Sequence, residues 1–502
     1  MRVKSERPTR EQLIELARTD PEAIADLVLA LLDRIEALEA KVAGLERNSR
    51  TSSKPPSSDK GNFGNPPKPK SRRSKTGRKC GGQKGHRGET LRQSESPDHI
   101  VEHHLAEDAL CPNCGASLED AACEGLESGS CECRQVFELP AIRIEITEHR
   151  AEKKLCPWCG TLVRAEFPEG VNAPVQYGPG VQATALYLGG YQLIPYQRLS
   201  EIFAELLGCP LSPGTLANFV KRGGKHAAAA MVPVRDALVN APVAHADETG
   251  CTLHGKRHWL HVFSTSSLSC YHIDAKRGGE AMERMGLLPW FHGALVHDFL
   301  NAYYLFLTCA HFLCNSHLLR ELTYIHEEMD QAWAADMIEL LLDAKELSDR
   351  QKALPEGSRR VIGEQRRKNI QMRYCDIVLE GFGINPEPPP PPKPKPGRVK
   401  RSKPLNLLIR LDQRYEEIMG FFEYDHIPFD NNQAERDLRM MKVREKISGT
   451  FRSDLHASAF CDIRSIISCA RKQSLKIVRT LADLIKSPLS LGKNLVDTVG
   501  PE

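Results

Sequence analysis

Three carboxylate side chains stand at positions from which they could share divalent metal ions. Asp247 ends the apolar segment APVAHAD and Asp298 ends the apolar segment GALVHD, so we expect each of them at the end of a buried strand. Glu435 falls in the first turns of a helix that we expect Asn431 or Asn432 to cap. Acids at the ends of adjacent strands can meet an acid from a helix that crosses the edge of the sheet.

Three such carboxylates are suited to phosphodiester cleavage and strand transfer. Two divalent ions about 4 Å apart can stabilise the attacking and leaving oxygens. Mg²⁺ prefers carboxylate ligands and keeps positions for water and phosphate. We therefore expect Asp247, Asp298 and Glu435 to hold two Mg²⁺ or Mn²⁺ ions. Each acid alone has an ordinary interpretation, as a turn residue or a solvated helix residue, so the prediction rests on their combination.

Basic side chains are gathered in two places. From residue 50 to residue 92 there are thirteen lysines and arginines against two acids, in a segment rich in Ser, Pro and Gly. We expect residues 50–100 to form a disordered linker that contacts DNA phosphates without sequence specificity, although it could serve only to solubilise the chain. The residues expected to contact DNA are Lys68, Lys70, Arg72, Arg73, Arg78 and Lys79 in the linker and Arg436, Arg439 and Lys442 after Glu435.

Two matching CPxCG segments provide four cysteines with the spacing of zinc ligands. In each segment a tight turn brings two thiolates together, and the glycine permits the backbone bend. We expect Cys111, Cys114, Cys156 and Cys159 to bind one structural zinc ion in a closed four-sulfur site. This zinc-binding ribbon, residues 101–170, could bind DNA ends or have a purely architectural role.

The N-terminal segment, residues 1–49, is expected to form a helix with a leucine zipper. Apolar residues alternate at spacings of three and four over about three heptads, which favours a parallel two-stranded coiled coil. Packing of one amphipathic helix on its own domain is the alternative. The zipper positions are Val28, Leu31, Ile35, Leu38, Val42 and Leu45.

Residues 171–238 are expected to be helical. A helix over about 197–207 should end at Gly208, and a second helix should start near Ser212 and Pro213. This pattern is typical of a helix-turn-helix that binds DNA, and equally of an ordinary helical bundle.

A catalytic α/β domain is expected over residues 239–485, followed by a tail over residues 486–502. It should contain a three-stranded meander that begins at Asp247 and a helical insertion at about 320–410, which includes a proline-rich stretch. A chain of 502 residues is too long for one ordinary core, so several domains are expected. We find no signal peptide and no apolar run of about 18 residues, so we expect a cytoplasmic protein without membrane spans.

Several segments occur in the order seen in transposases of the insertion sequence 66 family, and the chain resembles that family from the zipper helix to about residue 480. These segments are SSKPPSSD, GGQKGHRGETL, RQVFELP, the two CPxCG knuckles, ADETG and NNQAERDLRMMKVREKISGTFRS. The resemblance implies a multidomain α/β protein with a ribonuclease H-like catalytic domain, whose acidic triad is Asp247, Asp298 and Glu435. Many relatives have a DGY-like segment where this chain has HDFLNAY at Asp298.

The resemblance adds an accessory element to the triad. Cys314 and His317 match the Cys-x-x-His element of the family, with Arg320 beyond them. These residues could position the active site or DNA, or they could simply pack a helix. The nearby acids that we expect to lie outside the triad are Glu248, Asp274 and Asp437.

The function implied by the resemblance is metal-dependent strand cleavage and strand transfer at the ends of an insertion sequence. The implied partners are the terminal inverted repeats, target DNA, helper proteins of the same element and further copies of the chain, as a homodimer or a larger synaptic oligomer. The implied setting is the bacterial cytoplasm, with association to the nucleoid when DNA is bound. Two alternatives stay open: a catalytically inactive DNA-binding protein or regulator, and a general ribonuclease H-like nuclease.

Overall fold

The computed structural model describes most of the chain and divides it into two compact units. The larger unit takes in Met1–Gly61, Thr147–Glu205 and Cys209–Glu502, and the smaller one takes in Asn62–Ile146 and Leu206–Gly208. None of the described helices is both long and apolar enough to cross a lipid bilayer. The described residues are 10–22, 24–25, 29, 34, 91–106, 108–119, 132–140, 142–355, 362–388 and 401–498.

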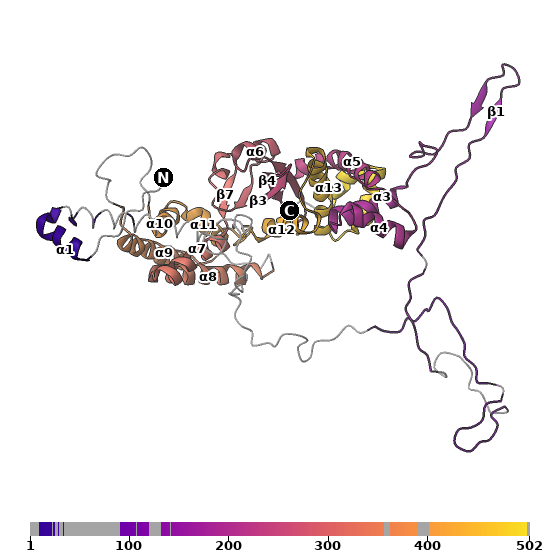
Figure 1. Cartoon of the computed structure of the whole chain (residues 1–502), viewed down its shortest axis with the longest axis horizontal. Coiled ribbons are helices and arrows are strands. Elements are labelled where there is room, and N and C mark those ends of the chain that lie inside the picture. Colours follow the sequence, from indigo (N-terminus) through magenta and orange to yellow (C-terminus); the bar gives the residue numbers. More distant parts are fainter. Residues whose placement is uncertain are drawn as a thin grey trace. The chain divides into compact units, whose positions relative to one another are not determined.

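A five-stranded mixed sheet forms the core of the larger unit (Figure 1). Its strand order is β5-β4-β3-β6-β7. β3, β4 and β5 are antiparallel neighbours, whereas β6 is parallel to both β3 and β7. The strands are β3 (Val243–Leu253), β4 (Lys256–Ser264), β5 (Ser269–Asp274), β6 (Ala294–His297) and β7 (Ala310–Leu313).

Asp247 lies in the middle of β3 rather than at its end. Nine residue pairs hold β3 against β4, and the last of them joins Leu253 to Lys256. The two residues between them, His254 and Gly255, both have positive φ, as a tight hairpin turn requires. The prediction of a strand that ends at Asp247 is therefore wrong, because pairing with β4 extends the strand six residues further.

Helices cover both faces of this sheet. Leu295 on β6 packs into one apolar core with α5 and α13, whereas its neighbours Ala294 and Val296 pack into another core with α7 and α8. This alternation is that of a strand buried on both sides. In Figure 1, α7–α10 lie on one side of the strands, and α3, α4, α5 and α13 lie on the other.

The helices that form the core with Leu295 include the longest one of the described chain. They are α3 (Pro179–Leu186), α5 (Pro213–Val239), α6 (Gly279–Met285), α13 (Asp454–Lys472), α14 (Ile477–Lys486) and α15 (Pro488–Asp497). α4 (Tyr196–Leu207) precedes α5, and α1 (Arg10–Thr19) lies near the N-terminus of the chain. Short π- and 3-10 turns span Tyr187–Tyr191, Leu288–Trp290 and Tyr303–Leu305.

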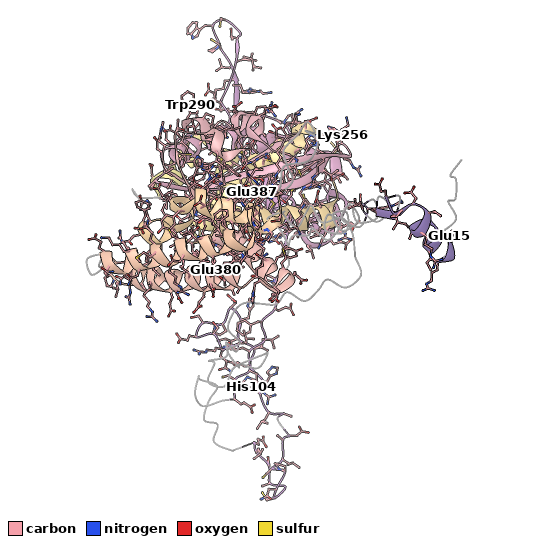
Figure 2. The ribbon with its side chains drawn as sticks, turned by 90° about the vertical axis from the view of Figure 1, so that its left-hand side faces the viewer. Glu15, His104, Lys256, Trp290, Glu380 and Glu387 are labelled. Atoms are coloured by element: carbon pink, nitrogen blue, oxygen red, sulfur yellow. The ribbon has the colours of Figure 1, made fainter. Side chains whose placement is uncertain are left out.

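The opposite helical layer lies between β7 and α12 in the chain. Trp333, fully buried on α8, is its largest core side chain, whereas Glu380 on α9 lies at its surface (Figure 2). Its helices are α7 (Asn315–Met329), α8 (Ala332–Lys352), α9 (Glu364–Ile384), α10 (Lys403–Gln413) and α11 (Tyr415–Glu423). α12 (Asn432–Ser448) follows and packs on β3 and β4.

The helix boundaries around residue 208 agree with the sequence. α4 ends at Leu207 before Gly208, which has a φ of 58°. The Oγ atom of Ser212 accepts a hydrogen bond from the N–H of Thr215 at 3.0 Å, and Pro213 starts α5. Because α5 continues to Val239 and buries its apolar side against α13, it belongs to the core of the larger unit. Whether the helix pair binds DNA stays a prediction.

The described residues of the expected ribbon form little secondary structure. A hairpin of β1 (Lys153–Leu155) and β2 (Leu162–Arg164) flanks the second knuckle. The alternating segments RQVFELP and IRIEITEHR belong to no helix or strand at their described residues.

The packing of α5 on α13 gives a test of the fold. A Cβ atom at Gly224 would lie 2.4 Å from the Cβ and 2.8 Å from the Cα of Ala459. We expect Gly224→Ala to lower the free energy of unfolding by about 1–3 kcal/mol, because the backbone of α13 must shift. Thermal unfolding followed by circular dichroism would measure the change. Gly383→Ala in α9 is the control, since no atom lies within 4 Å of its new Cβ; equal stabilities of the two variants would contradict this packing.

Candidate active site

Asp247 and Asp298 come from adjacent parallel strands. His245 on β3 is paired with Val296 on β6. Asp247 comes two residues after His245, and Asp298 comes two residues after Val296, so the two acids lie at the same height across the two strands. Carboxylate oxygens of Asp247, Asp298 and Glu248 all lie within 4.8 Å of one another. The structure thus brings the two predicted strand acids together and adds Glu248, which we had expected to lie outside the triad.

Glu435 is placed by the first residues of α12. Asn431, at the N-cap position, donates a hydrogen bond from Nδ2 to the backbone oxygen of Ala246 at 2.7 Å. Its Oδ1 atom lies 2.8 Å from Nδ1 of His245. The expected side-chain cap is therefore not formed, because the Asn431 amide instead holds the start of α12 against β3, beside Asp247.

The negative charges of these acids affect one another's pKa values. Burial, followed by the charges of Glu248 and Asp298, raises the pKa of Asp247 well above its ordinary value. Burial and the charge of Glu248 raise the pKa of Asp298 to about 7. The charge of Glu435 raises both pKa values further. A cation bound among these carboxylates would remove much of this repulsion.

Both carboxylate oxygens of Glu248 have close side-chain partners. Nη2 of Arg277 lies 2.7 Å from Oε1, and the Tyr303 hydroxyl donates a hydrogen bond to Oε2 at 2.8 Å. Arg277 also lies 3.9 Å from Oδ2 of Asp298, and it stacks over the ring of Trp259. We did not predict Arg277 or Tyr303, since neither residue belongs to a motif and both reach the acids only through the folded sheet.

The Cys-x-x-His element lies beside the helix acid. Donor atoms of Cys314, His317 and Glu435 all lie within 4.8 Å of one another. Nη2 of Arg320 lies 3.2 Å from Oε1 of Glu435, which fixes one oxygen of that carboxylate. All three accessory residues predicted from the sequence therefore lie beside Glu435.

The basic side chains of α12 differ in their exposure. Arg436 and Arg439 are exposed. Lys442 is half-buried and donates a hydrogen bond to the backbone oxygen of Gly250 at 2.6 Å, and it also lies 3.5 Å from Glu445. The side chains of Arg436 and Arg439 are therefore open to solvent, whereas Lys442 is held against β3. The basic residues predicted between 68 and 79 and the zipper positions lie outside the described residues.

The two CPxCG knuckles have the same backbone hydrogen bond. The N–H of Gly115 donates to the oxygen of Cys111 at 2.8 Å, and the N–H of Gly160 donates to that of Cys156 at 2.9 Å. Both glycines have positive φ, at 74° and 69°. Each knuckle is thus a tight turn with paired cysteines, as predicted. The knuckles belong to different units, so the zinc site that they would share with Cys114 and Cys159 stays a prediction.

The buried aspartate gives a pH-dependent prediction for the metal-free protein. An unfolded aspartate titrates near pH 4, whereas the pKa of Asp298 is about 7 in the folded chain. Between these values the folded state keeps a proton that the unfolded state has released, so the free energy of unfolding falls as pH rises. Asp298→Asn should therefore stabilise the protein more at pH 8 than at pH 4, by at least about 1 kcal/mol.

Chemical denaturation in the presence of a chelator would measure this difference. Asp274→Asn is the matched control, because Asp274 is ion-paired to Arg284 and lies outside the acidic cluster. A stabilisation by Asp298→Asn that is the same at both pH values would contradict the raised pKa.

Comparison with known proteins identifies the region that carries these acids. The model of the family described as "Transposase IS66 family" matches residues 174–459, which is more than half of the chain. A family of unknown function matches residues 5–92. No curated protein matches the chain at a significant level. The first match includes β3, β6 and α12, and the chain therefore belongs to the IS66 family of transposases.

Proposed function

We propose that the chain is a DDE-type transposase that cleaves DNA at the ends of an insertion sequence and joins them to target DNA. The observation that carries this proposal is the convergence of Asp247 and Asp298 from level positions on adjacent strands, with Glu435 contributing to the electrostatics of both. The mixed sheet and the packing on β3 of α12, the helix that carries Glu435, support a ribonuclease H-like catalytic domain.

The donor set fits hard divalent ions. Asp247, Asp298 and Glu435 offer only carboxylate oxygens, which are the ligands that Mg²⁺ and Mn²⁺ prefer. When bound, two such ions would activate the attacking oxygen and stabilise the leaving oxygen. Arg277 pairs with Glu248 at 2.7 Å and lies farther from Asp298, at 3.9 Å, so the strand acids would keep oxygens for the ions. Arg320 orients the Glu435 carboxylate.

We also propose roles for the other parts of the chain. We propose that the knuckle cysteines bind one structural zinc ion and that the basic linker holds DNA phosphates. The helical insertion that we propose at about 320–410 would include most of α7 and α10, with all of α8 and α9. The inverted repeats, a homodimer or larger synaptic complex, and helper proteins of the element complete the proposed assembly.

Substitution of the acids tests the catalytic assignment. We expect Asp247→Asn, Asp298→Asn and Glu435→Gln each to reduce Mg²⁺-dependent cleavage of end-containing DNA by at least about 100-fold, since metal catalysis supplies several kcal/mol. Chelation should abolish cleavage, and added Mg²⁺ or Mn²⁺ should restore it. Asp274→Asn should retain activity. Mutant activity equal to the wild type would overturn the triad.

The same assay separates the alternatives. DNA binding without cleavage by the wild-type chain, measured with the helper proteins present, would favour an inactive DNA-binding protein. Cleavage that ignores the end sequence would favour a general nuclease.

The exposed arginines of α12 give a separate prediction. Arg436→Ala combined with Arg439→Ala should weaken DNA binding and reduce the slope of log affinity against log salt by about 2, because two phosphate contacts are lost. Fluorescence anisotropy at several salt concentrations would measure the slope. Arg350→Ala with Arg366→Ala removes the same charge from exposed positions of α8 and α9. An equal loss in this control pair would refute a specific contact by α12.

A further inference from the structure

A second group of metal-binding side chains lies beside the proposed catalytic acids. It consists of the Cys314 thiol, the His317 ring and the Glu435 carboxylate, whose donor atoms lie within 4.8 Å of one another. Cys314 and His317 are buried, whereas Glu435 is partly exposed. An ion could therefore enter from the side of Glu435.

The surroundings of Cys314 suit a metal-bound thiolate. The N–H of Asn431 donates a hydrogen bond to its sulfur at 3.1 Å. Cys314 is also the N-cap residue of α7, where the helix dipole favours negative charge. Both effects favour the ionised sulfur, whereas burial, the largest influence, raises the pKa of the Cys314 thiol to about 12. The charge of a bound cation must therefore drive the ionisation.

His317 adds a nitrogen donor with no competing partner. Its Nδ1 atom is buried and makes no hydrogen bond among the described residues. Its Nε2 atom lies 3.6 Å from Oε1 of Glu435. Nε2 is therefore the ring nitrogen that the structure places beside the Glu435 carboxylate, where an ion shared by the two side chains could bind.

We propose that Cys314, His317 and Glu435 bind one thiophilic divalent ion of the zinc class. On binding, the Cys314 thiol gives its proton to solvent, and the thiolate and carboxylate together balance the charge of the ion. Three protein ligands leave a fourth tetrahedral position for water. Mg²⁺ does not suit this site, because hard cations avoid sulfur.

The site shares Glu435 with the proposed catalytic centre. An ion held by Cys314 and His317 draws the Glu435 carboxylate toward α7 and so competes with its use beside Asp247 and Asp298. A zinc-class ion is therefore an inhibitor of the Mg²⁺-dependent reaction. This consequence rests on the proposed function, whereas the binding of the ion does not.

Titration with Co²⁺ tests the binding site directly. The full chain first receives one molar equivalent of Zn²⁺, which the closed four-sulfur site proposed for the knuckles should take in preference to a three-ligand site, and is then titrated with Co²⁺ while the thiolate-to-cobalt charge-transfer absorption is recorded. The wild type should develop this band with one further ion, and Cys314→Ser should not. Cys309→Ser is the matched control, since Cys309 is a buried thiol outside the cluster. A band of equal intensity in Cys314→Ser, or no band in the wild type, overturns the proposal.

A second variant keeps the test decisive if Cys314→Ser does not fold. His317→Gln should retain the thiolate band but weaken Co²⁺ binding by at least about tenfold, since even loss of an outer-shell partner costs about 10–100-fold. Unchanged Co²⁺ affinity in His317→Gln overturns the proposal.

Inhibition is measured separately in the cleavage assay with Mg²⁺. Zn²⁺ should inhibit the wild type and Cys309→Ser at concentrations at least about tenfold lower than it inhibits Cys314→Ser. If Zn²⁺ inhibits the wild type, Cys309→Ser and Cys314→Ser at the same concentration, the proposed competition for Glu435 is overturned. A wild type that cleaves nothing with Mg²⁺ alone contradicts the proposed function, while the Co²⁺ titration still decides the metal site.

Discussion

Repulsion between buried carboxylates is the constraint on which the centre of this protein depends. Asp247, Glu248 and Asp298 hold oxygens within 4.8 Å of one another, and burial with mutual repulsion raises the pKa values of both aspartates. A flexible chain would separate these charges. The parallel pairing of β3 with β6, inside a sheet covered on both faces, keeps them together. Arg277 compensates part of this negative charge, through Glu248 at 2.7 Å and Asp298 at 3.9 Å, and a bound cation would compensate more of it.

The short segment before α12, residues 429–431, fixes where Glu435 lies relative to the strand acids. The N–H of Asn315 donates to the backbone oxygen of Phe429 at 3.1 Å, and the side chain of Asn431 binds Ala246 on β3. The start of α12 is thus held by α7 on one side and by the sheet on the other. The position of Glu435 therefore depends on the helical layer as well as on the strands.

The sequence revealed the acids more readily than their arrangement. Apolar runs that end in Asp247 and Asp298 predicted two buried strands, and the IS66 resemblance is confirmed by the family match. The level placement of the two acids depends on the pairing of β3 with β6, which no local pattern encodes. For the same reason β3 was predicted too short, since its continuation is stabilised by β4. Arg277 could not be predicted, because its contact with Glu248 joins segments that meet only after folding.

The order of the elements along the chain has a consequence for incomplete products of translation. Glu435 is made 137 residues after Asp298, and α7 to α11 are synthesised in between. A stop codon or frameshift anywhere in those helices yields a polypeptide that keeps both knuckles and both strand acids but lacks the third acid. Such a product also lacks Asn431, so His245 and the Ala246 carbonyl lose their partner. A truncated copy of the gene would therefore encode a chain that retains the N-terminal segments, Asp247 and Asp298 without Glu435.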